Sequence, residues 1–291
     1  MHGILVINPF MHPTEGVHQA QRMQEEFLAL GVETEIVKDG YLRCMLDGKD
    51  ILFDNKDVKF AVFFDKDKYF STALEKAGVR VFNNSKAIKD CDDKGETYIQ
   101  LSNFDIKMPK TIFAPLCYHE HSEIEYSSAK IIAKKLGFPM IVKESFGSMG
   151  NGINKVDNVD DLFAIMKRLK NKPHLFQEYL GYKKGTDIRI IVVGGKAIAC
   201  MQRHNENDFR SNLAKGGKGT KITPEKQFID TAEKCAKVLN LDYCGVDLLY
   251  GNEGEPIVCE VNSNAFFSGI ESVTKVNVAK AYAKHILKIV R

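Results

Sequence analysis

The sequence predicts a mixed α/β and α+β protein, in which a small parallel α/β unit precedes a region of β-hairpins and helices. Strand-like and helical apolar patterns alternate over the first ninety residues, as they do in a parallel sheet with crossover helices. Later strand-like runs come in pairs joined by glycine-rich turns, which is typical of hairpins. The length of 291 residues is enough for two domains.

In the first ninety residues the alternation predicts four strands and two main helices. The strands are expected over residues 3–7, 33–37, 60–64 and 79–82, and the helices over 18–30 and 70–77. Ser85 is expected to cap a further short helix, because serine side chains accept from the first free backbone N–H groups. No G-x-G-x-x-G follows the first strand, so a Rossmann dinucleotide site is not predicted.

The remaining residues predict helices and paired strands around one long polar segment. Helices are expected over 94–101, 130–136, 160–169, 224–239 and 275–290, and strands over 138–143, 153–156, 174–179, 188–193 and 196–203. The segment 204–223 is polar, basic and rich in glycine. A loop of this length is usually functional or disordered.

The composition indicates an ordinary globular enzyme. Apolar residues make up 44% and charged residues 27%, and the net charge is only +3, which favours neither nucleic acid nor an anionic membrane as a partner. No apolar run approaches the roughly 20 residues that span a bilayer. The seven cysteines are dispersed and form no CxxC pair, which is typical of reduced thiols in a cytoplasmic protein. We therefore expect a cytoplasmic location.

Residues 144–152, ESFGSMGNG, join two of the predicted strands. Gly147, Gly150 and Gly152 permit positive φ, so that successive N–H groups can surround phosphate oxygens. A Walker A loop is not indicated, because no Gly-Lys pair is followed by Ser or Thr. An ordinary mobile turn explains the glycines equally well when they are considered alone.

Residues 242–264 predict an acidic hairpin. Side chains alternate along a strand, so Glu260 and Asn262 share one face. Pairing Tyr250 with Ile257 would place Asp247 opposite Glu260 on that face. An all-oxygen ligand set suits Mg²⁺. The alternative is a solvated acidic face, and a slip of one residue in the register would turn Asp247 away.

A phosphate-binding loop, a lysine before it, a basic loop and an acidic hairpin are the groups that nucleoside triphosphate chemistry needs. In this order they resemble the ATP-grasp superfamily, and most of all its RimK-like glutamate ligases, which include enzymes that add glutamate to the C-terminus of a ribosomal protein. The motifs are DK (93–94), IVKESFGSMGNGI (141–153), FQEYL (176–180), DIRIIVVGGKAIACMQR (187–203), NDFRSNLAKGG (207–217), CGVDLL (244–249) and EVNSN (260–264).

The resemblance implies a pre-ATP-grasp domain over 1–90 and an ATP-grasp domain over 91–291, with subdomains 91–175 and 176–291 that hold ATP between them. It implies that ATP is bound by Lys94, Lys143, Ser148, Met149, Gly150, Glu178, Tyr179, Leu180, Asp187, Arg210, Ser211 and Asn212. Arg203 and Arg210 would act in catalysis. Asp247, Glu260 and Asn262 would hold two Mg²⁺ ions, or Mn²⁺ in their place.

The implied reaction joins a carboxylate to an amine through an acylphosphate, with glutamate or a similar amino acid added to a peptide, a protein C-terminus or a small carboxylate. Relatives form dimers or tetramers, so a homo-oligomer is expected. The alternative is a nucleotide-binding module that has lost catalysis. Residues 263–271, SNAFFSGIE, stand where relatives have a Ser-Pro-Gly turn, so Phe266 and Phe267 are expected to alter the acceptor pocket.

Overall fold

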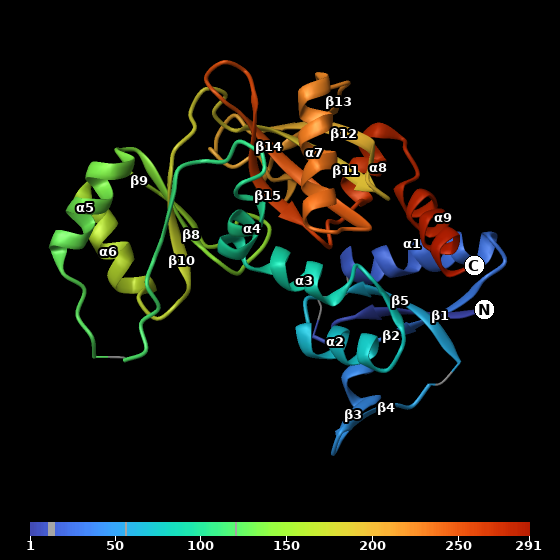
Figure 1. The fold of residues 1–291 in the computed structure, drawn as a ribbon. Coiled ribbons are helices and arrows are strands. Elements are labelled where there is room, and N and C mark those ends of the chain that lie inside the picture. The colour runs from blue at the N-terminus through green and yellow to red at the C-terminus, as the bar shows by residue number, and fades with distance from the viewer. Residues whose placement is uncertain (11–14, 56, 120) are drawn as a thin grey trace.

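The computed structural model describes residues 1–10, 15–55, 57–119 and 121–291. In this part of the chain it has a parallel sheet, two antiparallel sheets and a small separate hairpin. Figure 1 shows the three larger sheets as distinct parts of the molecule, with helices packed on them. The predicted mixed α/β and α+β class is confirmed.

The N-terminal sheet is parallel and has the strand order β2-β1-β5-β6. Its strands are β1 (His2–Ile7), β2 (Glu33–Val37), β5 (Val58–Phe64) and β6 (Arg80–Phe82), and its helices are α1 (Glu15–Ala29), α2 (Lys68–Lys76) and α3 (Ser85–Asp92). β1 and β5 are buried along almost their whole length, as expected for a sheet covered on both faces. This order puts a topological switch between β1 and β5, because the chain moves outward from β1 in both directions.

Two details of this region differ from the sequence-based expectation. The cap of α3 is Asn84, not Ser85, because the Asn84 side chain accepts from the backbone N of Ala87 at 2.9 Å. The segment between β2 and β5 also holds a 3₁₀ helix, η1 (Gly40–Leu42), and a protruding hairpin of β3 (Cys44–Asp47) and β4 (Asp50–Phe53) (Figure 1).

The second sheet is antiparallel and has the order β7-β10-β8-β9. It comprises β7 (Thr111–Phe113), β8 (Met140–Glu144), β9 (Ile153–Val156) and β10 (His174–Glu178), with helices α5 (Tyr126–Leu136) and α6 (Val159–Leu169). Both helices pack their apolar residues on this sheet. α5 begins four residues before the predicted start, because Ala129 is buried in this core and the Tyr126 hydroxyl donates to Asp160 at 2.7 Å.

The third sheet is antiparallel, with the order β13-β12-β11-β14-β15. Its strands are β11 (Thr186–Val193), β12 (Lys196–His204), β13 (Lys218–Lys221), β14 (Tyr243–Tyr250) and β15 (Pro256–Asn262). Its helices are α4 (Lys94–Leu101), α7 (Lys226–Val238), α8 (Ser268–Thr274) and α9 (Val278–Val290). The expected basic loop therefore contains a strand, β13, and a 3₁₀ helix, η2 (Leu213–Lys215), while α8 is not predicted by the sequence pattern.

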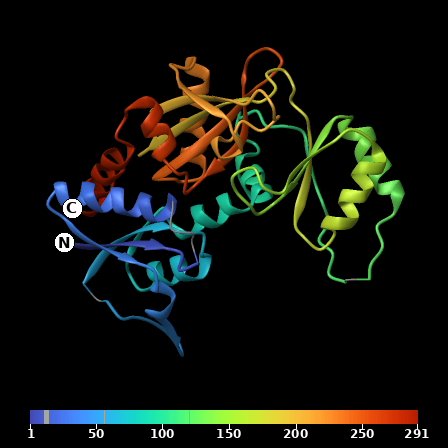
Figure 2. The same cartoon turned by 180° about the vertical axis from the view of Figure 1, so that it is seen from behind.

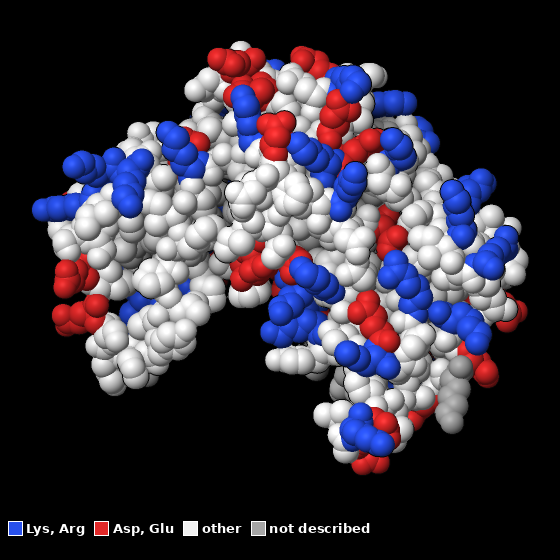
Figure 3. Space-filling view, viewed as in Figure 1, with Lys and Arg blue, Asp and Glu red and all other residues white. Residues whose placement is uncertain are grey.

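One apolar core joins the parallel sheet to the third sheet. It combines residues of β1, β5 and α1 with residues of β11, β12, α8 and α9. Figure 2 shows α1 and α9 side by side between the two sheets. None of the described helices is long and apolar enough to cross a membrane. Figure 3 shows a wide concavity between the part that holds α5 and α6 and the part that holds α2.

Candidate active site

The acidic hairpin has the predicted central pair and an unpredicted bulge. Asp247 pairs with Glu260, as expected, but Tyr250 pairs with Pro256, so the predicted partner Ile257 is wrong. The register shifts between Asp247 and Leu248, where β15 carries the extra residue Cys259. A β-bulge of this kind re-aims side chains and is frequent beside active sites.

Two arginines surround the carboxylate of Asp247, which is buried. Arg189 lies directly opposite on β11 and donates from Nε and Nη2 to the two carboxylate oxygens, at 2.7 Å each. Arg203 Nη2 lies 2.9 Å from Oδ2. Burial alone would raise the pKa of Asp247, but the two guanidinium groups outweigh it and hold the pKa below its ordinary value.

Asp187 and Arg203 extend this network across β11 and β12. Arg203 is fully buried and donates from Nε to Asp187 Oδ1 at 2.8 Å and from Nη2 to the other oxygen. The side chains therefore form one row of alternating charges, in the order Asp187, Arg203, Asp247 and Arg189. The sequence motifs do not single out Arg189, although its place two residues after Asp187 puts both side chains on one strand face.

The two predicted phosphate lysines lie beside the acidic hairpin. Lys94 Nζ donates to the carbonyl of Gly147 at 2.8 Å and lies 3.5 Å from Glu260 Oε1. Lys143 Nζ donates to Cys259 Sγ at 3.8 Å. Burial would lower the pKa of Lys143, but the acidic groups around it, with Cys259 the largest contributor, raise it above its ordinary value. Both lysines therefore place a positive charge beside β15 of the acidic hairpin, next to Glu260 and Cys259.

The glycine-rich loop and the basic loop touch. Arg210 Nη1 donates to the carbonyl of Gly150 at 3.0 Å, and Lys215 Nζ donates to Asn151 Oδ1 at 2.9 Å. Gly150 has φ +74°, and a Cβ there would lie 2.9 Å from Asn212 Oδ1. Ser211, beside these residues, is buried. The two loops thus form one cover over the face that carries Glu260.

Glu178, Tyr179 and Leu180 lie where the second sheet leads into the third. Glu178 ends β10 and accepts from the backbone N of Lys110 at 2.9 Å. The Tyr179 ring meets the Phe209 ring edge-on at 6.4 Å between centroids, and Phe209 directly precedes Arg210. Tyr179 therefore connects this crossing segment to the basic loop.

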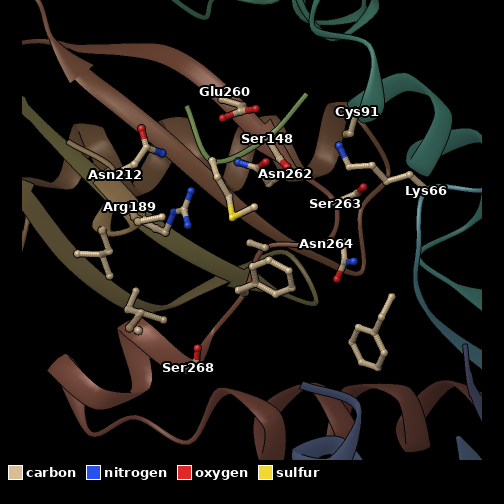
Figure 4. Close-up of a pocket in the computed structure, with 18 of the residues that line it drawn as sticks. Lys66, Cys91, Ser148, Arg189, Asn212, Glu260, Asn262, Ser263, Asn264 and Ser268 are labelled. Carbon is tan, nitrogen blue, oxygen red and sulfur yellow. The ribbon is translucent and has the colours of Figure 1, made fainter. Parts of the chain in front are cut away.

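A cavity of about 400 Å³ opens beside these groups. Of the predicted site residues, it is lined by Ser148, Met149, Arg203, Asn212, Glu260 and Asn262. Figure 4 shows Arg189 and Asn212 on one side of it, and Lys66 and Asn264 on the other. The remaining predicted residues do not line this cavity: Lys94, Lys143, Gly150, Glu178, Tyr179, Leu180, Asp187, Arg210, Ser211 and Asp247.

The two phenylalanines after the hairpin have different places. Phe266 lines the cavity, whereas Phe267 is 1% exposed and packs edge-on against Tyr243. The cavity is also lined by residues that the sequence did not single out, among them Asn8, Asp65 and Lys66. These three come from the parallel sheet, whose contribution depends on the tertiary packing of distant segments.

Residues 91–286 match the family model described as RimK-like ATP-grasp domain. The chain belongs to the RimK-like ATP-grasp family. A probable alpha-L-glutamate ligase of Marinomonas sp. is 32% identical over 98% of this chain and 94% of its own length. A second one, from Maridesulfovibrio salexigens, is 36% identical over 74% of this chain and 69% of its own length. The protein is accordingly an ADP-forming ligase that makes carbon–nitrogen bonds.

Other relatives of this RimK-like protein carry different names. Human N-acetylaspartylglutamate synthase A is 31% identical over 74% of this chain and 54% of the synthase. Among solved structures, D-alanine–D-alanine ligase from Bacillus anthracis has a TM-score of 0.75 at 17% identity, over 100% of this chain and 97% of that one. A RimK domain protein from Sphaerobacter thermophilus has a TM-score of 0.71 at 17% identity, over 99% and 100%. These structures show the ATP-grasp fold.

The acidic hairpin of this RimK-like protein fits a divalent metal by its donor set. Asp247, Glu260 and Asn262 supply only oxygen and amide groups, which suit Mg²⁺. Asn262 Nδ2 is buried and has no hydrogen-bond partner among the described residues, and turning the amide would present its oxygen there instead. The described parts of the chain contain no cluster of three or more His, Cys, Asp or Glu that could hold a metal ion, and the hairpin itself offers two carboxylates and one amide.

Proposed function

We propose that the protein uses ATP to add glutamate or a similar amino acid to a peptide, a protein C-terminus or a small carboxylate. The observation that carries this proposal is the meeting of Glu260, Lys94 and the two touching loops beside one cavity. The relatives named as glutamate ligases support the choice of amino acid.

In this proposal the phosphates of ATP lie under the cover formed by residues 145–152 and 205–217. Lys94, Lys143 and Arg210 offset their charge, with Ser148, Met149, Gly150, Ser211 and Asn212 around them. Glu178, Tyr179 and Leu180 hold the adenine, and Asp187 the ribose. In the present structure Asp187 is engaged by Arg203, so a ribose contact requires the Asp187 carboxylate to accept from both groups.

Asp247, Glu260 and Asn262 would hold two Mg²⁺ ions, or Mn²⁺. When bound, these ions supply positive charge that stabilises the transferring phosphoryl group. A solved ATP-grasp ligase with a TM-score of 0.71 and 19% identity to this chain was obtained with Mg and ADP, which supports Mg²⁺ as the metal. In the present structure Arg189 and Arg203 donate to both carboxylate oxygens of Asp247, so metal binding requires Asp247 to use its remaining lone pairs or these guanidinium groups to move.

The reaction proceeds in two steps. An oxygen of the acceptor carboxylate attacks the γ-phosphorus of ATP, and ADP leaves with the bond electrons. The neutral amine then attacks the acylphosphate carbonyl, phosphate leaves, and the amine nitrogen loses its extra proton. Arg203 and Arg210 stabilise the negative charge that develops in both steps. A covalent intermediate with the protein is not needed.

We also propose that residues 1–90 form a pre-ATP-grasp domain and residues 91–291 the ATP-grasp domain, with its subdomains meeting near residue 175. The end of β10 at Glu178 and the separate core of the second sheet support this division, although Ala87, Cys91 and Leu101 pack into the core of the third sheet. A homo-oligomer, dimer or tetramer, is proposed by analogy with relatives, and light scattering of the purified protein tests it.

The function is tested by measuring ADP release from ATP and Mg²⁺ with a panel of amino acids, each paired with peptide and small carboxylate acceptors. We expect ADP only when both substrates are present, and a product whose mass equals the two substrates minus water. Loss of ADP formation with every pair would favour a nucleotide-binding module without catalysis. Formation of ADP without an amide product would contradict the second step.

A further inference from the structure

The carboxyl edge of the parallel sheet forms one wall of the cavity. Asn8 directly follows β1 and Asp65 directly follows β5, and the last paired residues of these neighbouring strands are Ile7 and Phe64. The topological switch of the sheet lies between the same two strands. Ligands of open parallel sheets bind at the carboxyl ends of the strands, at such a switch point. The fold therefore places Asn8 and Asp65 where a substrate is expected.

Asp65 is held in one orientation by neighbouring donors. Asn8 Nδ2 donates to Oδ1 at 3.2 Å and to Oδ2 at 3.1 Å. The backbone N of Lys66 donates to Oδ1 at 2.7 Å. These bonds fix the carboxylate against the cavity while leaving acceptor capacity on Oδ2, since each carboxylate oxygen can accept about two bonds.

The charge of Asp65 is not matched by a nearby cation. No Lys, Arg or His among the described residues lies within ion-pair distance of it, and the Nζ of the adjacent Lys66 pairs with Asp92 Oδ1 at 2.7 Å instead. Asp65 is half-buried, and burial raises the pKa of its carboxyl. A partly desolvated carboxylate without a counterion gains most from a ligand that brings a positive charge and N–H donors.

The opposite end of the cavity carries arginines that are paired with acids but keep donor capacity: Arg189 uses Nε and Nη2 on Asp247, which leaves Nη1 to donate to an anionic group of a ligand. Arg189 and Arg203 line it there, beside Glu260 and Asn262, and Phe266 and other apolar residues form the wall between the ends. A ligand with an ammonium group and an anionic group would therefore match both ends. Among free α-amino acids, glutamate and aspartate carry such an anionic group on the side chain, several bonds from the ammonium group.

We propose that Asp65, positioned by Asn8, binds the ammonium group of a substrate that carries one, such as an α-amino acid. This inference rests on the proposed function, since it names a recognition group for a substrate of that reaction. The binding site is distinct from the acidic hairpin, because it belongs to the parallel sheet and faces the hairpin from across the cavity.

The test measures binding rather than turnover. Affinities for L-glutamate, L-aspartate and L-alanine are compared by calorimetry with those for glutarate, succinate and propionate, which lack the amino group, in the presence of ADP and Mg²⁺. In the wild type, at least one amino acid should bind about tenfold or more tightly than its partner, as one charge-assisted hydrogen bond predicts. Asp65→Asn should remove most of this ratio, and Asn8→Ala should reduce it.

The matched control is Asp47→Asn, because Asp47 is an exposed carboxylate on the β3 hairpin that does not line the cavity. It should leave the ratio unchanged. Circular dichroism checks folding, and if Asp65→Asn does not fold, Asn8→Ala carries the test. A ratio that survives in Asp65→Asn, or a wild type that prefers none of the three amino acids, would overturn the proposal.

Failure of the proposed function would be seen separately. ADP release is measured on the same wild-type preparation with the same amino acids, each paired with the panel of peptide and small carboxylate acceptors. If no ADP forms but the amino acid still binds more tightly than its partner without the amino group, and this difference depends on Asp65, the ligase reaction is rejected and the binding site is kept. If ADP forms but the affinity ratio is unchanged in Asp65→Asn, the reaction is kept and the binding site is rejected.

Discussion

At the scale of single residues, the central feature is the charge network around Asp247. The alternation of strand residues was enough to predict that Asp247 faces Glu260, because both lie on one short hairpin. It could not predict that Arg189 and Arg203 surround Asp247, since those contacts depend on how strands about fifty residues apart are paired. The network changes what mutation of Asp247 is expected to do.

Asp247→Asn should destabilise the protein as well as inactivate it. The substitution removes the negative charge that Arg189 and Arg203 share, and leaving a buried charge uncompensated costs about 3–5 kcal/mol. Asp187 still pairs with Arg203, so the lower end of this range is expected. Urea unfolding followed by circular dichroism measures the free energy of unfolding. Unchanged stability would show that the two guanidinium groups are hydrated rather than buried with Asp247.

Glu260→Gln should reduce activity with little effect on the fold. Glu260 is only partly buried. Its loss takes away the carboxylate that lies 3.5 Å from the Nζ of the buried Lys94, but Lys94 still donates to the carbonyl of Gly147. Loss of one group that organises the phosphoryl-transfer charge should lower kcat by about a hundredfold or more. ADP release at saturating Mg²⁺ measures this. Near-normal, Mg²⁺-dependent activity would show that Glu260 is not a metal ligand.

At the scale of elements, the sequence predicted the main strands and helices but not the bulge at Cys259, α8 or β13. Periodicity detects apolar alternation, and a single extra residue in a strand changes it too little to be seen. β13 is exposed and polar, so its pairing with β12 leaves no apolar pattern. In the glycine-rich loop, by contrast, positive φ was expected from the glycines themselves, and Gly147, Gly150 and Gly152 all adopt it.

Gly150→Ala should separate the two covering loops. A Cβ at this position would lie 2.9 Å from Asn212 Oδ1 while the backbone keeps φ +74°, so steric contact adds to backbone strain. The KM for ATP should rise about tenfold, corresponding to the ~1–3 kcal/mol of such strain. Gly48→Ala is the control, because Gly48 also has positive φ but a Cβ there would meet nothing within 4 Å. Equal effects of the two changes on KM would contradict the loop contact.

The junction of α1 and α9 should be sensitive to pH. Burial would raise the pKa of Glu26, but hydrogen bonds from Asn277 at 2.6 Å and Arg22 at 3.1 Å outweigh it and lower the pKa. A lowered pKa gives stability that is present above the ordinary value of about 4.3 and is lost as pH falls through the native value. Glu26→Gln should therefore cost about 1–2 kcal/mol at pH 7.

This cost should shrink in acid, and unfolding measured between pH 7 and pH 3 checks it. Glu25→Gln is the neighbouring control, because Glu25 is exposed and also bonds Arg22, at 2.7 Å. An exposed ion pair contributes about 0–1 kcal/mol. A Glu26→Gln cost that stays constant from pH 7 to pH 3 would show that its ionisation does not stabilise the junction.

At the scale of the whole molecule, the cavity depends on how the parallel sheet meets the hairpin sheet. The sequence predicted each region and its order, but not Asn8, Asp65 and Lys66 in the cavity wall, because no local pattern reports a contact between residues about two hundred positions apart. The side chain of Asn83 holds the parallel sheet against the third sheet. Its Oδ1 accepts from the backbone N of Asp242 and Tyr243, and its Nδ2 donates to the carbonyls of Tyr243 and Ser263, each at 2.7–2.9 Å.

Asn83→Ala should weaken both stability and substrate binding. The side chain is 2% exposed, so its removal leaves buried backbone groups of Tyr243 without partners, at a cost of about 2–4 kcal/mol. Ser263 begins the segment that continues to Phe266 in the cavity wall, so the KM for the amino-acid substrate should rise more than the KM for ATP. Thermal unfolding and steady-state kinetics measure the two effects.

The neighbouring Asn84→Ala is the control for this junction. Asn84 also bridges to the third sheet, through Nδ2 and the carbonyl of Asn240 at 2.8 Å, but that bond is exposed, and its cap on α3 accounts for about 1 kcal/mol. Asn84→Ala should therefore lower stability slightly and leave both KM values unchanged. Because Asn83, unlike Asn84, contacts the segment that leads into the cavity wall, a selective rise in the amino-acid KM identifies this buried amide as the group that sets the distance between the two walls. Equal KM values in the two variants would instead assign that distance to the apolar core shared by the two sheets.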